Sequence, residues 1–145
     1  MKRRRQEKKK NTGVLIDGEN ISARKARKIM DAVNNIGVLY TAKVYCRQKD
    51  PYTKNWASRS RENGIEDIRL YGGPAKDKVD NKIKKDARNL INLHRNVDII
   101  CLVTNDGGFT DVIMDLRNVG KKVVVFGGKQ APKRLRNSCN TFIEV

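Results

Sequence analysis

Residues 14–20 read Val-Leu-Ile-Asp-Gly-Glu-Asn, and this stretch decides the fold. Three apolar residues in succession are typical of a short buried strand, and the change to Asp, Gly, Glu and Asn marks the end of that strand. In an open parallel α/β sheet, ligands bind at the carboxyl ends of the strands. Asp17 therefore lies where a catalytic residue is expected.

Residues 99–106 have the same form, because Ile-Ile-Cys-Leu-Val is followed by Thr-Asn-Asp. Here too a buried apolar run ends on a carboxylate, that of Asp106. Two strands that each deliver an Asp to the same edge of a sheet predict an acidic, metal-binding site.

The apolar periodicity of the whole chain alternates between strand and helix. Strands are expected over 14–16, 38–46, 65–71, 97–104, 121–126 and 142–145. Helices are expected over 21–36, after Asp50-Pro51, over 80–95, between Gly107 and Gly120, and from Pro132. This alternation predicts an α/β fold with three layers, α/β/α, and a mainly parallel central sheet of Rossmann-like type. Asn20 is expected to cap the first helix and Gly37 to end it.

The charge of the chain favours a polyanionic partner. Of 145 residues, 32 are basic and 16 acidic, giving a net charge of +16. Residues 1–12 are expected to form a flexible basic arm and residues 13–145 a single domain. Residues 1–10 carry +6 and the remainder +10, so the domain itself is basic. Nucleic acid is the simplest partner, although charge that serves solubility alone is the alternative.

The sequence predicts a soluble cytoplasmic protein. No apolar run approaches the roughly 20 residues of a membrane span, and none fits the apolar core of a signal peptide. Cys46, Cys101 and Cys139 form no CxxC pair. Cys46 and Cys101 lie in apolar runs, which indicates small buried side chains in a reducing compartment.

Acidic and amide side chains gather at the predicted carboxyl edge: Asp17, Asn20, Asp80, Asp86 and Asp106, with Glu19 and Asp111 nearby. Helical phase puts Asp80 and Asp86 on the two shoulders of an apolar stripe. Two carboxylates 4 Å apart repel by about 4 kcal/mol at an effective dielectric of 20, so the group needs protons or a cation. Oxygen ligands without His or Cys suit Mg²⁺ or Mn²⁺. As alternatives, Asp17, Asp80 and Asp106 could cap helices and Asp86 could pair with a lysine.

Three further features have two interpretations each. Tyr52 and Trp56 beside arginines could stack unpaired bases, but packing against the sheet is favoured. His94 is interpreted as a packed or capping residue rather than a ligand. The loop Gly127-Gly128-Lys129 could hold a phosphate. Since neither GxGxxG nor GxxxxGK[ST] occurs, no nucleotide cofactor is expected.

Five segments, in order, resemble the NYN domain, and more narrowly its LabA-like branch, related to PIN-domain nucleases. They are 15–20, 78–80 with Asp86, 102–109, 120–125 and 135–143. The resemblance implies a PIN-like fold and a metal-dependent ribonuclease. By the match, Asp17, Asp80 and Asp106 would be metal-site acids, Asn20 would orient the site and Asp86 would support it.

The chain departs from the family at one position. The family's last motif usually reads Asp-x-Asp-Phe, whereas Asp106-Gly107-Gly108-Phe109 lacks the second acid. The leading hypothesis is an endoribonuclease that uses Mg²⁺ or Mn²⁺ and holds RNA through basic residues that include Arg24, Lys78, Lys84 and Lys129. The alternatives are a non-catalytic RNA-binding or regulatory protein with a weakened site, and a scaffold. A homodimer is compatible with the sequence.

Overall fold

The computed structural model describes residues 9–48, 50–71 and 77–145. Its strands are β1 (Asn11–Asp17), β2 (Val38–Arg47), β3 (Glu66–Leu70), β4 (Ile99–Val103), β5 (Lys122–Gly127) and β6 (Thr141–Glu144). Its α-helices are α1 (Ala26–Ile36), α2 (Trp56–Glu62), α3 (Lys78–Asn92), α4 (Thr110–Asn118) and α5 (Lys133–Ser138). Short 3₁₀ helices are η1 (Ala23–Lys25), η2 (Pro51–Thr53) and η3 (Gly107–Phe109).

The six strands form one sheet in the order β3-β2-β1-β4-β5-β6, and every pair is parallel. The predicted α/β fold with a parallel central sheet is confirmed. The chain builds outward from β1 through β2 to β3, then returns to place β4 on the other side of β1. In such sheets this reversal opens a crevice at the carboxyl ends of the two central strands, here β1 and β4.

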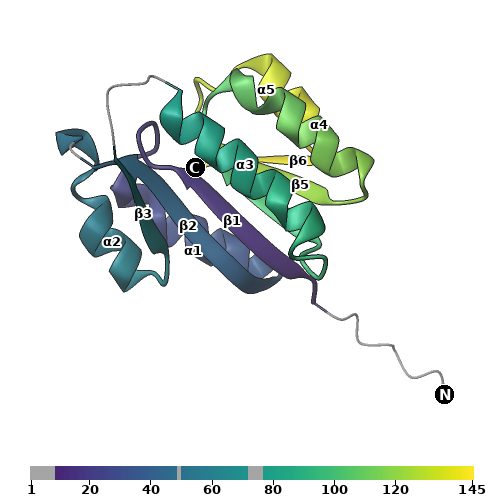
Figure 1. Ribbon diagram of the computed structural model, residues 1–145, viewed down its shortest axis with the longest axis horizontal. Helices are drawn as coiled ribbons and strands as arrows, with labels where there is room; N and C mark the ends of the chain where they lie inside the picture. The colour runs from purple at the N-terminus through teal and green to yellow at the C-terminus, as the bar shows by residue number, and fades with distance from the viewer. Residues whose placement is uncertain (1–8, 49, 72–76) are drawn as a thin grey trace.

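Helices cover both faces of the sheet, as the three-layer prediction requires (Figure 1). Side chains alternate along β1, so Val14 and Ile16 pack with α1 and with Trp56 of α2. Leu15 points to the opposite face, where α3, α4 and α5 pack. Both faces of β4 and β5 are buried, which explains why these strands read as continuous apolar runs.

Element ends differ from the predictions by a few residues. Ser22, not Asn20, caps the first helical turn, because its side chain accepts the Arg24 amide of η1. Gly37 and Gly120 follow α1 and α4 as predicted. The third α-helix begins at Lys78, two residues before the predicted start, so Asp80 lies inside its first turn. β1 extends back to Asn11, before the predicted domain start.

Trp56 and His94, for which the sequence allowed either packing or a role in binding, are both packed against other residues. Trp56 is 1% exposed and donates its indole N–H to the Ile21 carbonyl. His94 contacts Tyr40 through its ring and a hydrogen bond. All three cysteines are free and buried, which confirms that prediction for Cys46 and Cys101. The side chain of Tyr52, residues 1–8 of the predicted arm, and residues 72–76, where the sequence Gly-Gly-Pro at 72–74 predicts a loop, lie outside the described residues. No helix within the described ranges is long and apolar enough to cross a membrane.

Candidate metal-binding site

Asp17 ends β1 at the crevice and is 1% exposed. Its Oδ2 accepts hydrogen bonds from Asn20 Nδ2 at 2.7 Å and from Thr104 Oγ1 at 3.2 Å. Its Oδ1 is the one buried side-chain oxygen or nitrogen without a partner in the described parts of the chain. Burial raises the pKa of Asp17, and the two hydrogen bonds oppose that rise. The site thus holds a carboxylate oxygen whose bonding capacity is unused, at a high desolvation cost.

Two further acids face Asp17, and the three together are called the acid site. Asp80 comes from the first turn of α3 and Asp106 from the segment between β4 and η3. Their side chains share a hydrogen bond, and the charge of Asp17 also acts on Asp80. Burial, followed by that hydrogen bond, raises the pKa of Asp80 to about 7. The same interaction with Asp80 lowers the pKa of Asp106, so Asp80 is the acid of the pair that takes up a proton first.

Thr104 links the two strand ends. Its hydroxyl donates to Asp17 and accepts the backbone N–H of Asp106 at 3.1 Å. Asp106 Oδ1 in turn accepts the Gly108 N–H at 2.8 Å, so Asp106 also caps η3. The capping interpretation therefore holds for Asp106 in addition to its place in the acid site. Thr104 was not among the predicted site residues, although it lies in the Thr-Asn-Asp segment that drew attention to this strand.

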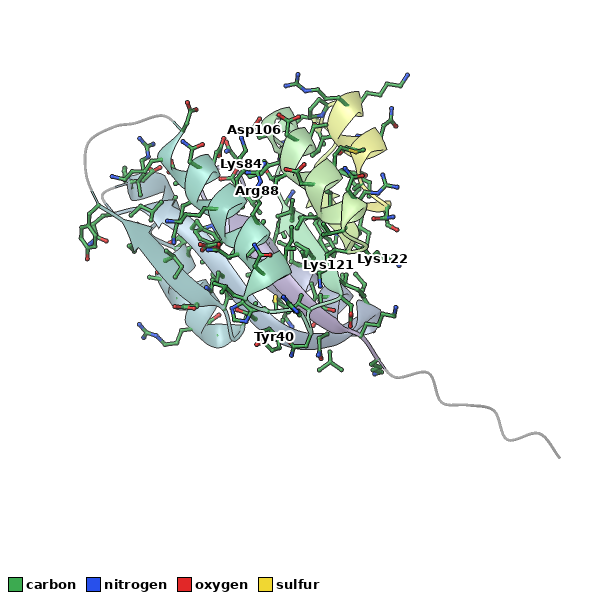
Figure 2. The ribbon with its side chains drawn as sticks, turned by 45° about the vertical axis from the view of Figure 1, so that its right-hand side comes forward. Tyr40, Lys84, Arg88, Asp106, Lys121 and Lys122 are labelled. Carbon is green, nitrogen blue, oxygen red and sulfur yellow. The ribbon has the colours of Figure 1, made fainter. Side chains whose placement is uncertain are left out.

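Two cations border the acid site. Lys84 of α3 lies with its Nζ 5.4 Å from the centre of the Phe109 ring, and it lowers the pKa values of Asp80 and Asp106 (Figure 2). Arg134 of α5 also lowers the pKa of Asp106. Its guanidinium fills the space in front of Gly107, where an added Cβ would lie 2.2 Å from Nε. Lys84 was expected to bind RNA, whereas Arg134 was missed because only the packing of α5 against η3 brings it here.

The other predicted site residues lie elsewhere. Asp86 accepts a 2.6 Å hydrogen bond from Tyr45 and pairs with Lys82, on the α3 face of the sheet. Glu19 pairs with Arg47 at 2.8 Å. The remaining four are placed as follows: Asp111 is exposed on α4, Lys78 donates to the Tyr71 carbonyl, Arg24 is exposed on η1, and Lys129 is exposed after β5. The structure thus brings Asp17, Asn20, Asp80 and Asp106 together, and leaves Asp86 and Glu19 with other partners.

Gly18 fixes the turn that holds Asp17 at the crevice. Its N–H donates to the Tyr45 carbonyl, and an added Cβ would lie 2.5 Å from Cys46 Sγ and 2.8 Å from Val44 Cγ2. Both contacts are shorter than packed atoms tolerate, and both neighbours are buried. The motif therefore needs glycine at this position because the backbone passes directly against β2.

Replacing Gly18 with Ala is expected to lower the free energy of unfolding by about 1–3 kcal/mol, the usual cost of overpacking a core. Urea unfolding measures this change. Gly64→Ala is not a suitable comparison because Gly64 has φ = 70°. Gly108→Ala is the better control, since its Cβ would meet only the Asp106 side chain, whose nearest atom, Oδ1, lies at 3.1 Å. Equal stability of Gly18→Ala and the wild type would contradict the close approach to β2.

The fold and the acids at its crevice define a Rossmann-like α/β domain with an acidic site between β1 and β4. The chain belongs to the NYN domain family, whose profile matches residues 11–145. It is similar in fold to a protein of unknown function from Vibrio parahaemolyticus, with a TM-score of 0.79 and 20% identity over 97% of this chain and 96% of that one. An oxidoreductase from Sinorhizobium meliloti aligns with a TM-score of 0.49 and 13% identity, over 96% of this chain and 37% of that one. The comparison with curated protein sequences gave no match.

Proposed function

We propose that this chain is a metal-dependent endoribonuclease of the LabA-like branch, acting in the cytoplasm. The observation that carries the proposal is the buried Asp17 oxygen without a partner, on a carboxylate whose charge interacts with those of Asp80 and Asp106 at the crevice. Membership of the NYN family supports a PIN-like nuclease fold. The basic surface supports RNA as the partner.

The donors at the acid site suit Mg²⁺ or Mn²⁺, because all of them are hard oxygens. As the side chains stand, no three His, Cys, Asp or Glu residues within the described ranges are arranged to hold a metal ion. Mg²⁺ commonly binds through one or two carboxylates and keeps several waters, so a closed cage of protein ligands is not required. Asp17 Oδ1 and the Asp80–Asp106 pair are the oxygens that would hold it. A bound ion of this kind supplies Lewis-acid charge that activates water and stabilises the leaving oxygen of a phosphodiester.

The remaining residues of the site position these groups. Asn20 and Thr104 fix the Asp17 carboxylate through Oδ2, which leaves Oδ1 free to bind a ligand. Asp80, whose pKa is raised to about 7, would have to be deprotonated to hold a cation together with Asp106. Lys84 and Arg134 provide positive charge beside Asp106, where a scissile phosphate would otherwise be repelled by the acids.

The first test is cleavage of labelled single-stranded and structured RNA with Mn²⁺, Mg²⁺ or EDTA. Cleavage is expected with either metal and not with EDTA. Asp106→Asn is expected to lose cleavage and keep RNA binding. The substitution removes a carboxylate that would hold the metal ion, and it removes none of the basic side chains that would hold RNA. If the wild type binds RNA and cuts under none of these conditions, the nuclease proposal fails.

A non-catalytic RNA-binding protein with a weakened site is the second candidate. It is favoured by Gly108, which stands where the family usually has a second acid, and by the engagement of Asp106 Oδ1 with the Gly108 N–H. Asp111, the nearest replacement in sequence, is exposed on α4. For such a protein Asp106→Asn would bind RNA as well as the wild type or slightly better, since the repulsion of phosphates falls.

The affinity for Mn²⁺ is expected to depend on pH. Below pH 7 protonation of Asp80 competes with binding of the ion, since the pKa of Asp80 is about 7. Affinity should therefore fall about tenfold for each pH unit below 7 and level off above it. Calorimetric titration with Mn²⁺ from about pH 5.5 to 8, in buffers of different ionisation enthalpy, measures both the affinity and the proton released. A pH-independent affinity would show that Asp80 takes no part in binding.

A further inference from the structure

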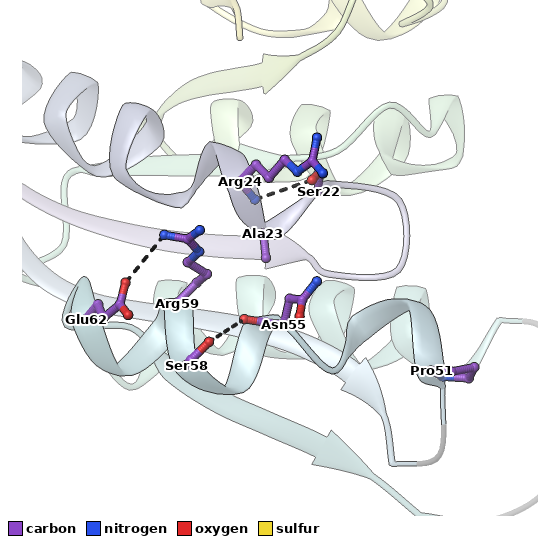
Figure 3. Close-up of a pocket in the computed structure, with 8 residues that line it drawn as sticks. All are labelled: Ser22, Ala23, Arg24, Pro51, Asn55, Ser58, Arg59 and Glu62. Atoms are coloured by element: carbon purple, nitrogen blue, oxygen red, sulfur yellow. Dashed lines mark hydrogen bonds and ion pairs between the residues drawn. The ribbon is translucent and has the colours of Figure 1, made fainter.

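We propose that a groove between η1 and α2 binds the phosphate backbone of single-stranded RNA that extends beyond the acid site. The inference rests on the proposed function, in which the acid site takes RNA. The groove encloses about 720 Å³. Its polar walls are formed mainly by Ser22, Arg24, Asn55, Ser58, Arg59 and Glu62, and it is called the η1–α2 groove below (Figure 3).

The position of the groove relates it to the acid site. The wall formed by η1 begins at Ser22, five residues after Asp17. The turn between these two residues is closed by the hydrogen bond from the Ile21 amide to the Asp17 carbonyl. Its other end is bordered by Pro51, which follows the carboxyl end of β2. The groove therefore opens at the same edge of the sheet as the acid site, on the face covered by α1 and α2. An RNA strand that leaves the acid site can pass over this edge into the groove.

Trp56 ties the two walls of the groove together. Its buried indole donates to the Ile21 carbonyl at 3.0 Å, which ties α2 to the segment that leads out of the Asp17 turn. The two walls therefore keep their spacing without a ligand. A site that exists before its ligand binds loses little conformational entropy on association.

The two arginines of the groove are available to an anion. Arg24 is exposed on the η1 wall, and Arg59 lies on the α2 wall (Figure 3). Arg59 lies 3.6 Å from Glu62, but their side chains are 51% and 61% exposed. An ion pair this exposed contributes little free energy, so Arg59 can exchange Glu62 for a phosphate. Residues 23–36 and 51–63 together hold seven basic residues and two acidic ones, which makes the surrounding surface basic.

The chemistry of the walls favours the sugar-phosphate backbone over the bases. The Ser22 hydroxyl and the Asn55 amide can donate to phosphate and ribose oxygens. The Ser58 hydroxyl donates to the Asn55 carbonyl at 3.2 Å, so it can only accept, for example from a ribose hydroxyl (Figure 3). Among the described side chains that line the groove none is aromatic, and Trp56 beneath it is buried, so no platform for base stacking is present there. The groove is therefore expected to lengthen the RNA contact without adding sequence preference.

The test compares a groove variant with a matched control. Arg24→Gln/Arg59→Gln removes two charges from the groove. Arg95→Gln/Lys122→Gln removes two exposed charges from the opposite, amino edge of the sheet, where Figure 2 shows Lys122. Binding of a fluorescent twelve-nucleotide oligouridylate is measured in EDTA over a salt series, so that no strand is cut during the titration.

The groove variant is expected to raise the Kd about tenfold. It should also make the slope of log K against log salt shallower by about 1.4, which corresponds to the loss of two phosphate contacts at about 0.7 each on a single strand. The control variant should change Kd less than about threefold. Wild-type affinity in the groove variant, or an equal loss in the control, would overturn the proposal. Binding is measured without metal, so this test does not depend on cleavage. If the protein never cuts RNA, the proposed nuclease activity is refuted, but the titration still shows whether the groove binds RNA.

Discussion

Replacing Asp17 with Asn is expected to lower the rate of Mn²⁺-dependent RNA cleavage by at least about 10²-fold, while the protein stays folded. The substitution keeps the size of the side chain and the oxygen that can accept from Asn20 and Thr104. It replaces the unpartnered Oδ1 with a neutral amide, which cannot serve as a charged ligand. Initial rates of cleavage with saturating Mn²⁺ give the comparison.

Thermal unfolding separates loss of function from loss of fold in the same variant. The wild type is expected to melt at a higher temperature when Mn²⁺ is added, because a ligand that binds only the native state stabilises it. Asp17→Asn should lose most of that shift and, without metal, melt no lower than the wild type, since a buried carboxylate is removed. Asp98→Asn is the matched control, because Asp98 is exposed next to the amino end of β4. Cleavage by Asp17→Asn at the wild-type rate would show that RNA is not cut at the acid site.

Replacing Trp56 with Ala is expected to lower the free energy of unfolding by about 3–5 kcal/mol, the usual range for deleting a buried aromatic side chain. Trp56 is among the largest fully buried side chains and packs with the α1 face of the sheet. Its loss opens a cavity beneath α2 and leaves the Ile21 carbonyl without its partner. Urea unfolding, with the slope compared between variants, measures the change.

Trp56→Phe divides this effect into packing and hydrogen bonding. It retains most of the apolar volume and loses the indole N–H, so a cost of about 1–2 kcal/mol is expected. A loss below about 1 kcal/mol for Trp56→Ala would contradict the burial of the side chain. The prediction also bears on RNA binding, because a Trp56 that is 1% exposed cannot stack on a base. That earlier alternative is therefore wrong for Trp56.

The layers of this fold are predictable from local sequence, but the order of its strands is not. Apolar runs such as residues 99–103 need two covered faces, and helices between them supply the cover. Nothing in the local pattern indicates that β4 pairs with β1 rather than with β3. The end of a helix is equally sensitive to context: Asn20 is a reasonable cap in sequence, yet its side chain bonds Asp17 and leaves Ser22 to cap η1.

The candidate site residues likewise divide into those that local sequence places and those that only tertiary packing places. Asp17 and Asp106 follow buried strands, so their common edge could be predicted from strand polarity alone. Helical phase places Asp86 on the shoulder of α3 but cannot specify the neighbour it meets, which is Tyr45 of β2. Arg134 reaches Asp106 from a helix near the end of the chain, a contact that only tertiary packing creates. The roles of these residues remain proposals that the experiments above test.

The pairing of β1 with β4 makes the acid site a product of the completed fold. The Thr104–Asp17 hydrogen bond closes a separation of 87 residues, and contacts of such range form late because the closure of long loops is entropically costly. The basic residues of η1, α1 and α2 all lie in the first half of the chain. During synthesis the chain would therefore expose this basic surface before β4 exists. The nuclease activity proposed above would then arise only when the second half has folded against the first.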